Sequence, residues 1–166
     1  LVHTLERVFR VYGTAGFMVQ TALMDMEFEK LKDKLPNVIL NTTAAREHVG
    51  EIERKIRVVK ERARCTTSIL PYDILPKIMI IELMHFCVMW MNSFPVKSGI
   101  SEKWSPREIV SRHRLDAKLH CKVPFGAYCE VHVDPDITNT MEPRTRWAIC
   151  LGPTGNMQGS YKFLSL

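Results

Sequence analysis

The longest amphipathic segment of the chain runs from residue 46 to residue 65. Its apolar residues recur at intervals of three or four positions, which places them on one face of an α-helix and gives the stripe Val49, Ile52, Ile56, Val59 and Ala63. The neighbouring face carries Arg46, Gly50, Glu53, Arg57, Lys60 and Arg64. The pattern predicts one long helix with an apolar side and a charged side.

Two short apolar segments before this helix predict strands. Residues 17–24 lie between Gly16 and Asp25, which is typical of a buried strand with an acid at its carboxyl end, and residues 37–41 form a second candidate. A helix over residues 1–12 and a short one over 27–35 precede these strands in turn, and Thr42 or Thr43 would cap the long helix. This order of elements predicts a mixed α/β sheet with helices packed on it.

The middle of the chain predicts two more helices. Residues 72–92 are apolar nearly all round after Pro76, so we expect a helix there that lies between layers. The Pro, Gly and Ser content of 94–104 predicts a loop, and Ser105-Pro106-Arg107-Glu108 has the residues of a capped helix start.

The pattern changes to strands after Pro124. Residues 127–134 alternate between apolar and polar, and 146–151 and 161–166 form two further short segments rich in strand-forming residues. Three short strands with turns between them predict either a small β-barrel or a three-stranded appendage.

The charge of the chain changes this picture modestly. Its formal net charge is +5, which favours polyanionic partners. Between Arg46 and Arg64 there are seven Lys or Arg against four Glu, so the long helix would present a positive face to a phosphate backbone. The alternative is a solvated surface on which Glu53 pairs locally with Arg57 and Lys60.

The cysteines and the apolar helix exclude several classes of protein. Five cysteines without a CxxC pair indicate reduced thiols of an intracellular protein, in the cytoplasm or the nucleus. The spacing of His120, Cys121, Cys129 and His132 matches no standard zinc pattern, so packing is the simpler interpretation. Residues 78–91 are too short to span a bilayer, and we expect no membrane partner and no signal peptide.

Two acids would suit metal-dependent chemistry. Phosphoryl transfer between DNA strands needs carboxylates that hold divalent metal ions, and Mg²⁺ prefers hard oxygen ligands. Asp25 at the end of a strand and Glu53 early in a helix packed beside that strand would converge at a sheet edge. They are the candidate catalytic and metal-binding pair.

Four segments, in order, resemble the integrases of copia-type retrotransposons. His48 to Arg57 resembles the family's Asn-Gly-x-x-Glu-Arg-x-Asn-Arg stretch, with Gly50 on its glycine and Glu53 on its last catalytic carboxylate. Residues 75–95 look like its Leu-Pro, apolar helix and Asn-Arg-x-Pro segment, and 104–108 look like its Thr-Pro-x-Glu. Residues 125–128, 146–152 and 159–161 look like the signature of the SH3-like module that follows the integrase core. The resemblance extends from about residue 17 to the end.

The resemblance implies an α/β fold in three parts: a partial RNase H-like core (1–95), a helical linker (96–122) and a small SH3-like β-barrel (123–166). Asp25 would be the second acid, although Asp25-Met26-Glu27 departs from the family's Asp-Asn-Gly or Asp-Arg-Gly and the gap to Glu53 is shorter than usual. Arg57 and Lys60 would match basic positions that hold DNA ends. With them, the candidate DNA-binding residues are Arg46, Arg54, Arg57, Lys60 and Arg64.

The implied activity is DNA integration with Mg²⁺ or Mn²⁺. The first acid and a zinc module are expected before Leu1, in a longer polyprotein, so we expect the isolated chain to bind no metal and to be inactive in strand transfer. A non-enzymatic nucleic-acid-binding or assembly module is the alternative, and an interaction domain with a solvated basic face is a third. If missing strands normally cover the apolar helix, the chain would also self-associate.

Overall fold

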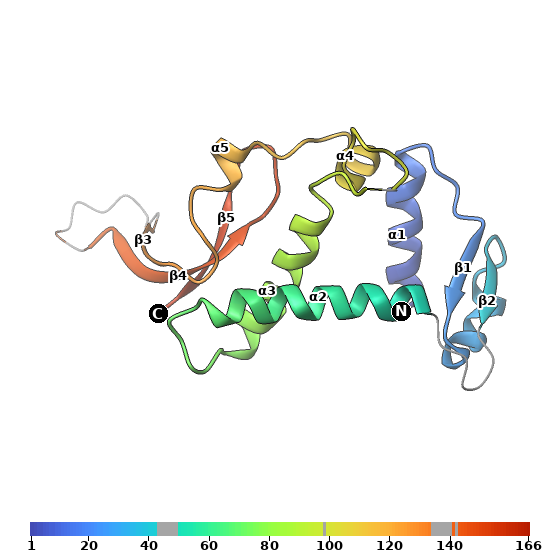
Figure 1. Cartoon of the computed structure of the whole chain (residues 1–166), viewed down its shortest axis with the longest axis horizontal. Coiled ribbons are helices and arrows are strands. Elements are labelled where there is room, and N and C mark those ends of the chain that lie inside the picture. The colour runs from blue at the N-terminus through green and yellow to red at the C-terminus, as the bar shows by residue number, and fades with distance from the viewer. Residues whose placement is uncertain (43–49, 98, 134–140, 142) are drawn as a thin grey trace.

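The computed structural model of the chain describes residues 1–42, 50–97, 99–133, 141 and 143–166. The fold is mixed α/β, with two small sheets at opposite ends of the molecule and helices between them (Figure 1). The elements are α1 (Val2–Thr14), β1 (Thr21–Met24), the 3₁₀-helix η1 (Met26–Lys34), β2 (Ile39–Thr42), α2 (Gly50–Ser68), α3 (Lys77–Met91), α4 (Pro106–Ser111), α5 (Ala117–His120), β3 (Tyr128–His132), β4 (Thr145–Pro153) and β5 (Tyr161–Ser165).

The first sheet consists of β1 and β2, which pair in parallel. Thr21 lies opposite Ile39 and Met24 opposite Thr42, and η1 connects the two strands. The expected helix over 27–35 is thus of the 3₁₀ type. The prediction of a buried first strand is wrong, since Leu23 is 49% exposed and the strand begins only at Thr21. In the described part of the chain, β1 has one neighbouring strand, and a two-stranded sheet buries little of either face.

The two long helices pack against each other, α2 on α3. Val59 and Ala63, in the carboxyl half of the apolar stripe of α2, contact the core, whereas Ile52 and Ile56 are 44% and 47% exposed. Met79, Leu83 and Cys87 are buried on one side of α3, and other apolar residues of α3 are exposed, namely Ile78, Ile80, Ile81 and Val88. The prediction that this helix lies between layers is therefore wrong, because its neighbours cover only part of its surface.

The second sheet is antiparallel, with strand order β3-β4-β5. Tyr128 lies opposite Ile149, and Ile149 lies opposite Leu164. The described residues form this three-stranded sheet and no closed barrel. Strand β4 packs against α3, and together they enclose the main apolar core, which consists of Met79, Leu83, Cys87, Phe125, Ile149 and Leu151.

Two glycines allow the sheet to approach the helices closely. Gly126 and Gly152 have φ values of +79° and +99°, which L side chains rarely adopt. A Cβ on Gly152 would lie 2.8 Å from Cδ2 of Phe86, and one on Gly126 would collide with Cδ2 of Leu70. Both positions therefore need glycine for backbone conformation and for space.

A local capping signal in the sequence predicts the short helix α4, whereas the short helix α5 shows no periodic pattern. Ser105 caps α4 as predicted: its Oγ accepts from Glu108 N at 3.2 Å, and the Glu108 carboxylate accepts from Ser105 N at 2.8 Å. The hydrogen bond from the Ser105 backbone, followed by the interaction with the Ser105 side chain, lowers the pKa of Glu108. Helix α5 lies within the expected helical linker (96–122), but it was not predicted as a separate element, because four residues are too few to show a periodic pattern.

Candidate nucleic-acid interface

The packing of α2 on α3 determines which face of α2 meets solvent. Because Val59 and Ala63 contact the core, the row of Arg57, Lys60 and Arg64 beside them remains exposed. Arg54 is also exposed, farther round the helix. Arg46 lies outside the described residues. The structure thus leaves four of the five candidate DNA-binding residues accessible.

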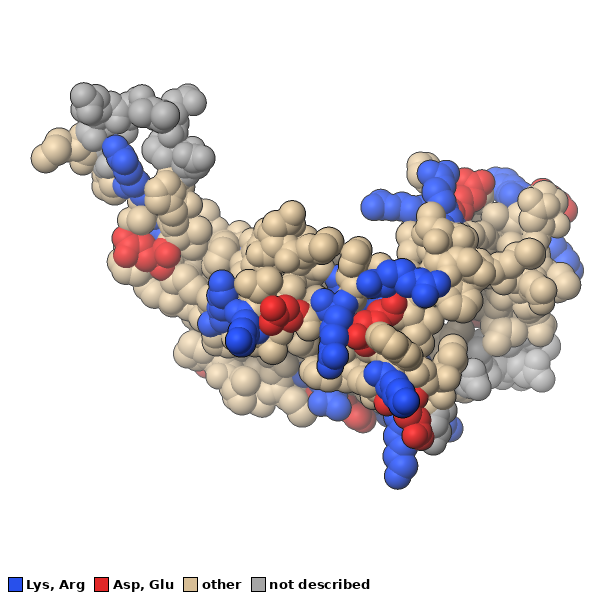
Figure 2. All heavy atoms as spheres, turned by 90° about the horizontal axis from the view of Figure 1, so that it is seen from above, with Lys and Arg blue, Asp and Glu red and all other residues tan. Residues whose placement is uncertain are grey.

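Acids interrupt the positive charge on the molecular surface. Figure 2 shows one face of the molecule on which Lys and Arg side chains alternate with Asp and Glu. On α2 itself the six Lys or Arg of residues 50–68 accompany three Glu. A polyanion would therefore bind to particular cations rather than to a continuous basic field.

Asp25 lies where the sequence places it, directly after β1 and at the carboxyl end of the parallel pair. Its carboxylate accepts a hydrogen bond from Met26 N at 2.8 Å and so caps η1. The side chain is exposed. Its observed local role is therefore to begin η1.

Glu53 lies in the first turn of α2 within the described residues, and it is exposed. The extensive contacts of α2 are with α3, and those of β2 are with β1 and η1. The described part of the chain brings together no group of three or more His, Cys, Asp or Glu side chains that could hold a metal ion. Within the described residues, Asp25 and Glu53 therefore belong to no group of three metal-binding side chains, and they supply at most two of the carboxylates that such a site needs.

His120 is buried, and both nitrogens of its ring contact backbone carbonyl oxygens. Its Nδ1 lies 2.8 Å from the carbonyl oxygen of Asp116, and its Nε2 lies 2.8 Å from that of Asn156. These contacts join α5 to the turn between β4 and β5.

All five cysteines are free, and burial raises the pKa of Cys87 and of Cys150, which keeps both as neutral thiols.

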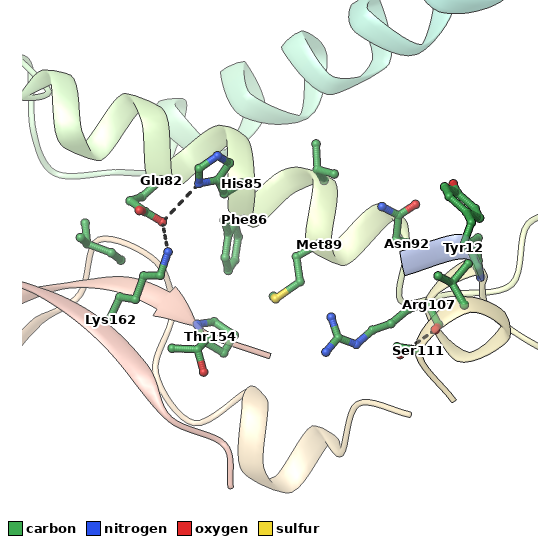
Figure 3. Close-up of a pocket in the computed structure, with 15 residues that line it drawn as sticks. Tyr12, Glu82, His85, Phe86, Met89, Asn92, Arg107, Ser111, Thr154 and Lys162 are labelled. Atoms are coloured by element: carbon green, nitrogen blue, oxygen red, sulfur yellow. Dashed lines mark hydrogen bonds and ion pairs between the residues drawn. The ribbon is translucent and has the colours of Figure 1, made fainter. Parts of the chain in front are cut away.

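A cavity of about 570 Å³ between α3, α4 and the β4–β5 region was not predicted. Figure 3 shows Arg107 extending into it from α4, with Lys162 and Glu82 at its other side. Glu82 accepts from the Lys162 ammonium at 2.8 Å and lies 3.6 Å from Nδ1 of His85. Glu82 and His85, the two polar residues within the apolar run 78–91, were the signal of this site in the sequence.

Comparisons with known proteins yield no relative. No family model, curated protein or solved structure matches this chain. Among the residues that the structure describes, no helix has both the length and the apolar character needed to cross a membrane.

Proposed function

We propose that the chain binds DNA through the exposed cations of α2, as the carboxyl part of an integrase-like protein of the copia type. The observation that carries this proposal is the orientation of α2. Its apolar stripe packs on α3 through Val59 and Ala63, so Arg57, Lys60 and Arg64 form an accessible row along the helix. Successive members of such a row are about one helical turn apart, so they can contact several phosphates.

The order of elements also supports the integrase-like relation. A helix, a strand, a short helix, a second strand parallel to the first and a long helix follow one another, with Asp25 at the end of the first strand and Glu53 on the long helix. Residues 123–166 contribute the three-stranded sheet, which we propose as the SH3-like part. In this interpretation Phe125-Gly126 and Leu151-Gly152 are the residues that fit the sheet against the helices.

DNA binding is the activity proposed for this chain by itself. Strand transfer in such enzymes requires three carboxylates around divalent metal ions, and Asp25 and Glu53 supply two. If the chain formed part of a complete site, their carboxylates would be the Mg²⁺ or Mn²⁺ ligands, and the ions would stabilise the charge of the reacting phosphate. We therefore expect DNA binding without strand transfer.

A charge-reversal experiment tests the proposal. The double variant Arg57→Glu/Lys60→Glu should weaken binding to a labelled DNA duplex at least about tenfold at low salt, because two favourable phosphate contacts become repulsive. The matched control is Arg7→Glu/Arg10→Glu, which makes the same change in net charge at exposed positions of α1. Fluorescence anisotropy measures both. Equal losses in the two variants, or no binding by the unmodified chain, would contradict the proposal.

A further inference from the structure

The cavity between α3, α4 and the β4–β5 region holds a cation whose charge is not balanced. Arg107 is partly buried, and its Nη2 donates to the carbonyl oxygen of Gly155. Its Nε is buried and has no hydrogen-bond partner within the described part of the chain. Among the described residues no carboxylate forms an ion pair with it. A partly buried guanidinium with an unused donor is costly, and an anion would relieve that cost.

The remaining charges of the cavity also favour an anion. Lys162 is the second cation of the lining, and Glu82 is its one carboxylate among the described residues. That carboxylate is already paired with Lys162 and with His85. The lining residues thus carry two permanent positive charges against one negative charge, and the negative one lies on the side away from Arg107 (Figure 3).

The size and the walls of the cavity narrow the class of ligand. About 570 Å³ lies within the range of small-molecule sites. Phe86, Met89 and Leu151 provide apolar wall next to the charged groups. A planar guanidinium matches phosphate oxygens, and an apolar wall suits a flat ring.

We propose that this cavity binds a nucleoside monophosphate, with the phosphate at Arg107 and the base against the apolar wall. The Arg107 guanidinium extends into the cavity (Figure 3), so its remaining N–H groups can donate to phosphate oxygens while Nη2 donates to the carbonyl oxygen of Gly155. Lys162, across the cavity and paired with Glu82, keeps the Glu82 charge from opposing the anion. The same chemistry occurs in a free nucleotide and in the phosphorylated end of a DNA strand.

Isothermal titration calorimetry with thymidine 5′-monophosphate tests the site, with thymidine as the probe that lacks the phosphate. We expect the monophosphate to bind at least about tenfold more tightly than thymidine, which corresponds to about 1.4 kcal/mol. Arg107→Met should abolish most of this preference, because it removes the charge and keeps an apolar stem. Arg114→Met is the matched control, since the Arg114 side chain is 86% exposed and does not line the cavity.

A second variant keeps the test decisive if Arg107→Met fails to fold. Lys162→Met, on the opposite side of the cavity, removes a cation and frees the Glu82 carboxylate, so it should also weaken the monophosphate more than thymidine. Equal affinity for thymidine and its monophosphate, no binding of the monophosphate, or unchanged binding by folded Arg107→Met would overturn the proposal.

Two further measurements distinguish a free nucleotide from a DNA end as the ligand, and distinguish the cavity from the α2 surface. Competition by a 5′-phosphorylated oligonucleotide, but not by its 5′-hydroxyl form, would identify a DNA end as the ligand. If neither oligonucleotide competes, the ligand is the free nucleotide. The variant Arg57→Glu/Lys60→Glu should bind the monophosphate like the unmodified chain, so failure of the α2 surface and failure of the cavity are distinguishable.

Discussion

The ammonium group of Lys162 lies 2.8 Å from Oε2 of Glu82 and joins β5 to α3 across 80 positions of sequence. The hydrogen bond from Lys162 is the main reason that the pKa of Glu82 is lowered, and the charges of Lys162 and His85 add to it against the opposing effect of burial. The pair therefore connects the ionisation of one carboxylate to the docking of the sheet on the helix.

This relationship predicts a pH-dependent contribution to stability. Because the folded pKa of Glu82 lies below its unfolded value, the contribution is present above the unfolded pKa and is lost as pH falls through the folded pKa. Lys162 is nearly half exposed, so Glu82→Gln should cost no more than about 1 kcal/mol at neutral pH. Urea unfolding at neutral pH and below the carboxyl range measures this difference, which should vanish in acid.

The control for this prediction is Glu6→Gln, which removes an exposed carboxylate from α1. Its effect on the free energy of unfolding should be small at both pH values. A cost of Glu82→Gln that stayed constant in acid would show that the pair does not act through the charge of Glu82.

The core between α3 and β4 predicts a large difference between two residues of one helix. Leu83 is 2% exposed and belongs to the core cluster, so Leu83→Ala should cost about 2–5 kcal/mol. Ile80 is 49% exposed, and Ile80→Ala should cost about 0.5 kcal/mol. Denaturant unfolding of both variants compares them, and similar losses would contradict the position of the core.

Local patterns in the sequence predicted where the helices and strands lie better than they predicted which of these elements are buried. The stripe of α2 and the Ser105 cap were sufficient because helix periodicity and capping depend on neighbouring residues. The burial of 17–24 and the covering of α3 depend on what packs against them, which local periodicity does not encode. Both predictions were wrong for that reason.

The candidate site shows the same division. The exposure of Arg57 and Lys60 followed from the amphipathic pattern of their helix. The cavity at Arg107 did not follow from any local pattern, because it brings together residues of α3, α4 and β5, which lie far apart in the sequence. Glu82 and His85, two polar residues within an apolar run, indicated that α3 had a polar contact to make.

The close approach of Gly152 to Phe86 predicts that no side chain is tolerated there. Gly152→Ala should destabilise the fold by about 1–3 kcal/mol from its positive φ alone, and the contact at 2.8 Å should add to this. Gly13→Ala is the control, since Gly13 lies in α1 and an added Cβ would meet none of the described residues within 4 Å. Alanine should stabilise that helix by about 0.5–1 kcal/mol. Thermal unfolding distinguishes the opposite signs.

The exposed row on α2 predicts a specific dependence of DNA affinity on salt. Each phosphate that the protein neutralises contributes about 0.9 to the slope of log affinity against log salt concentration. Replacing Arg57 and Lys60 by Gln removes two such charges without introducing repulsion, so the slope should become shallower by about 2. Arg7→Gln/Arg10→Gln makes the same change in net charge on α1 and should leave the slope unchanged. A slope that shifted equally in both variants would mean that net charge, rather than the α2 row, determines binding.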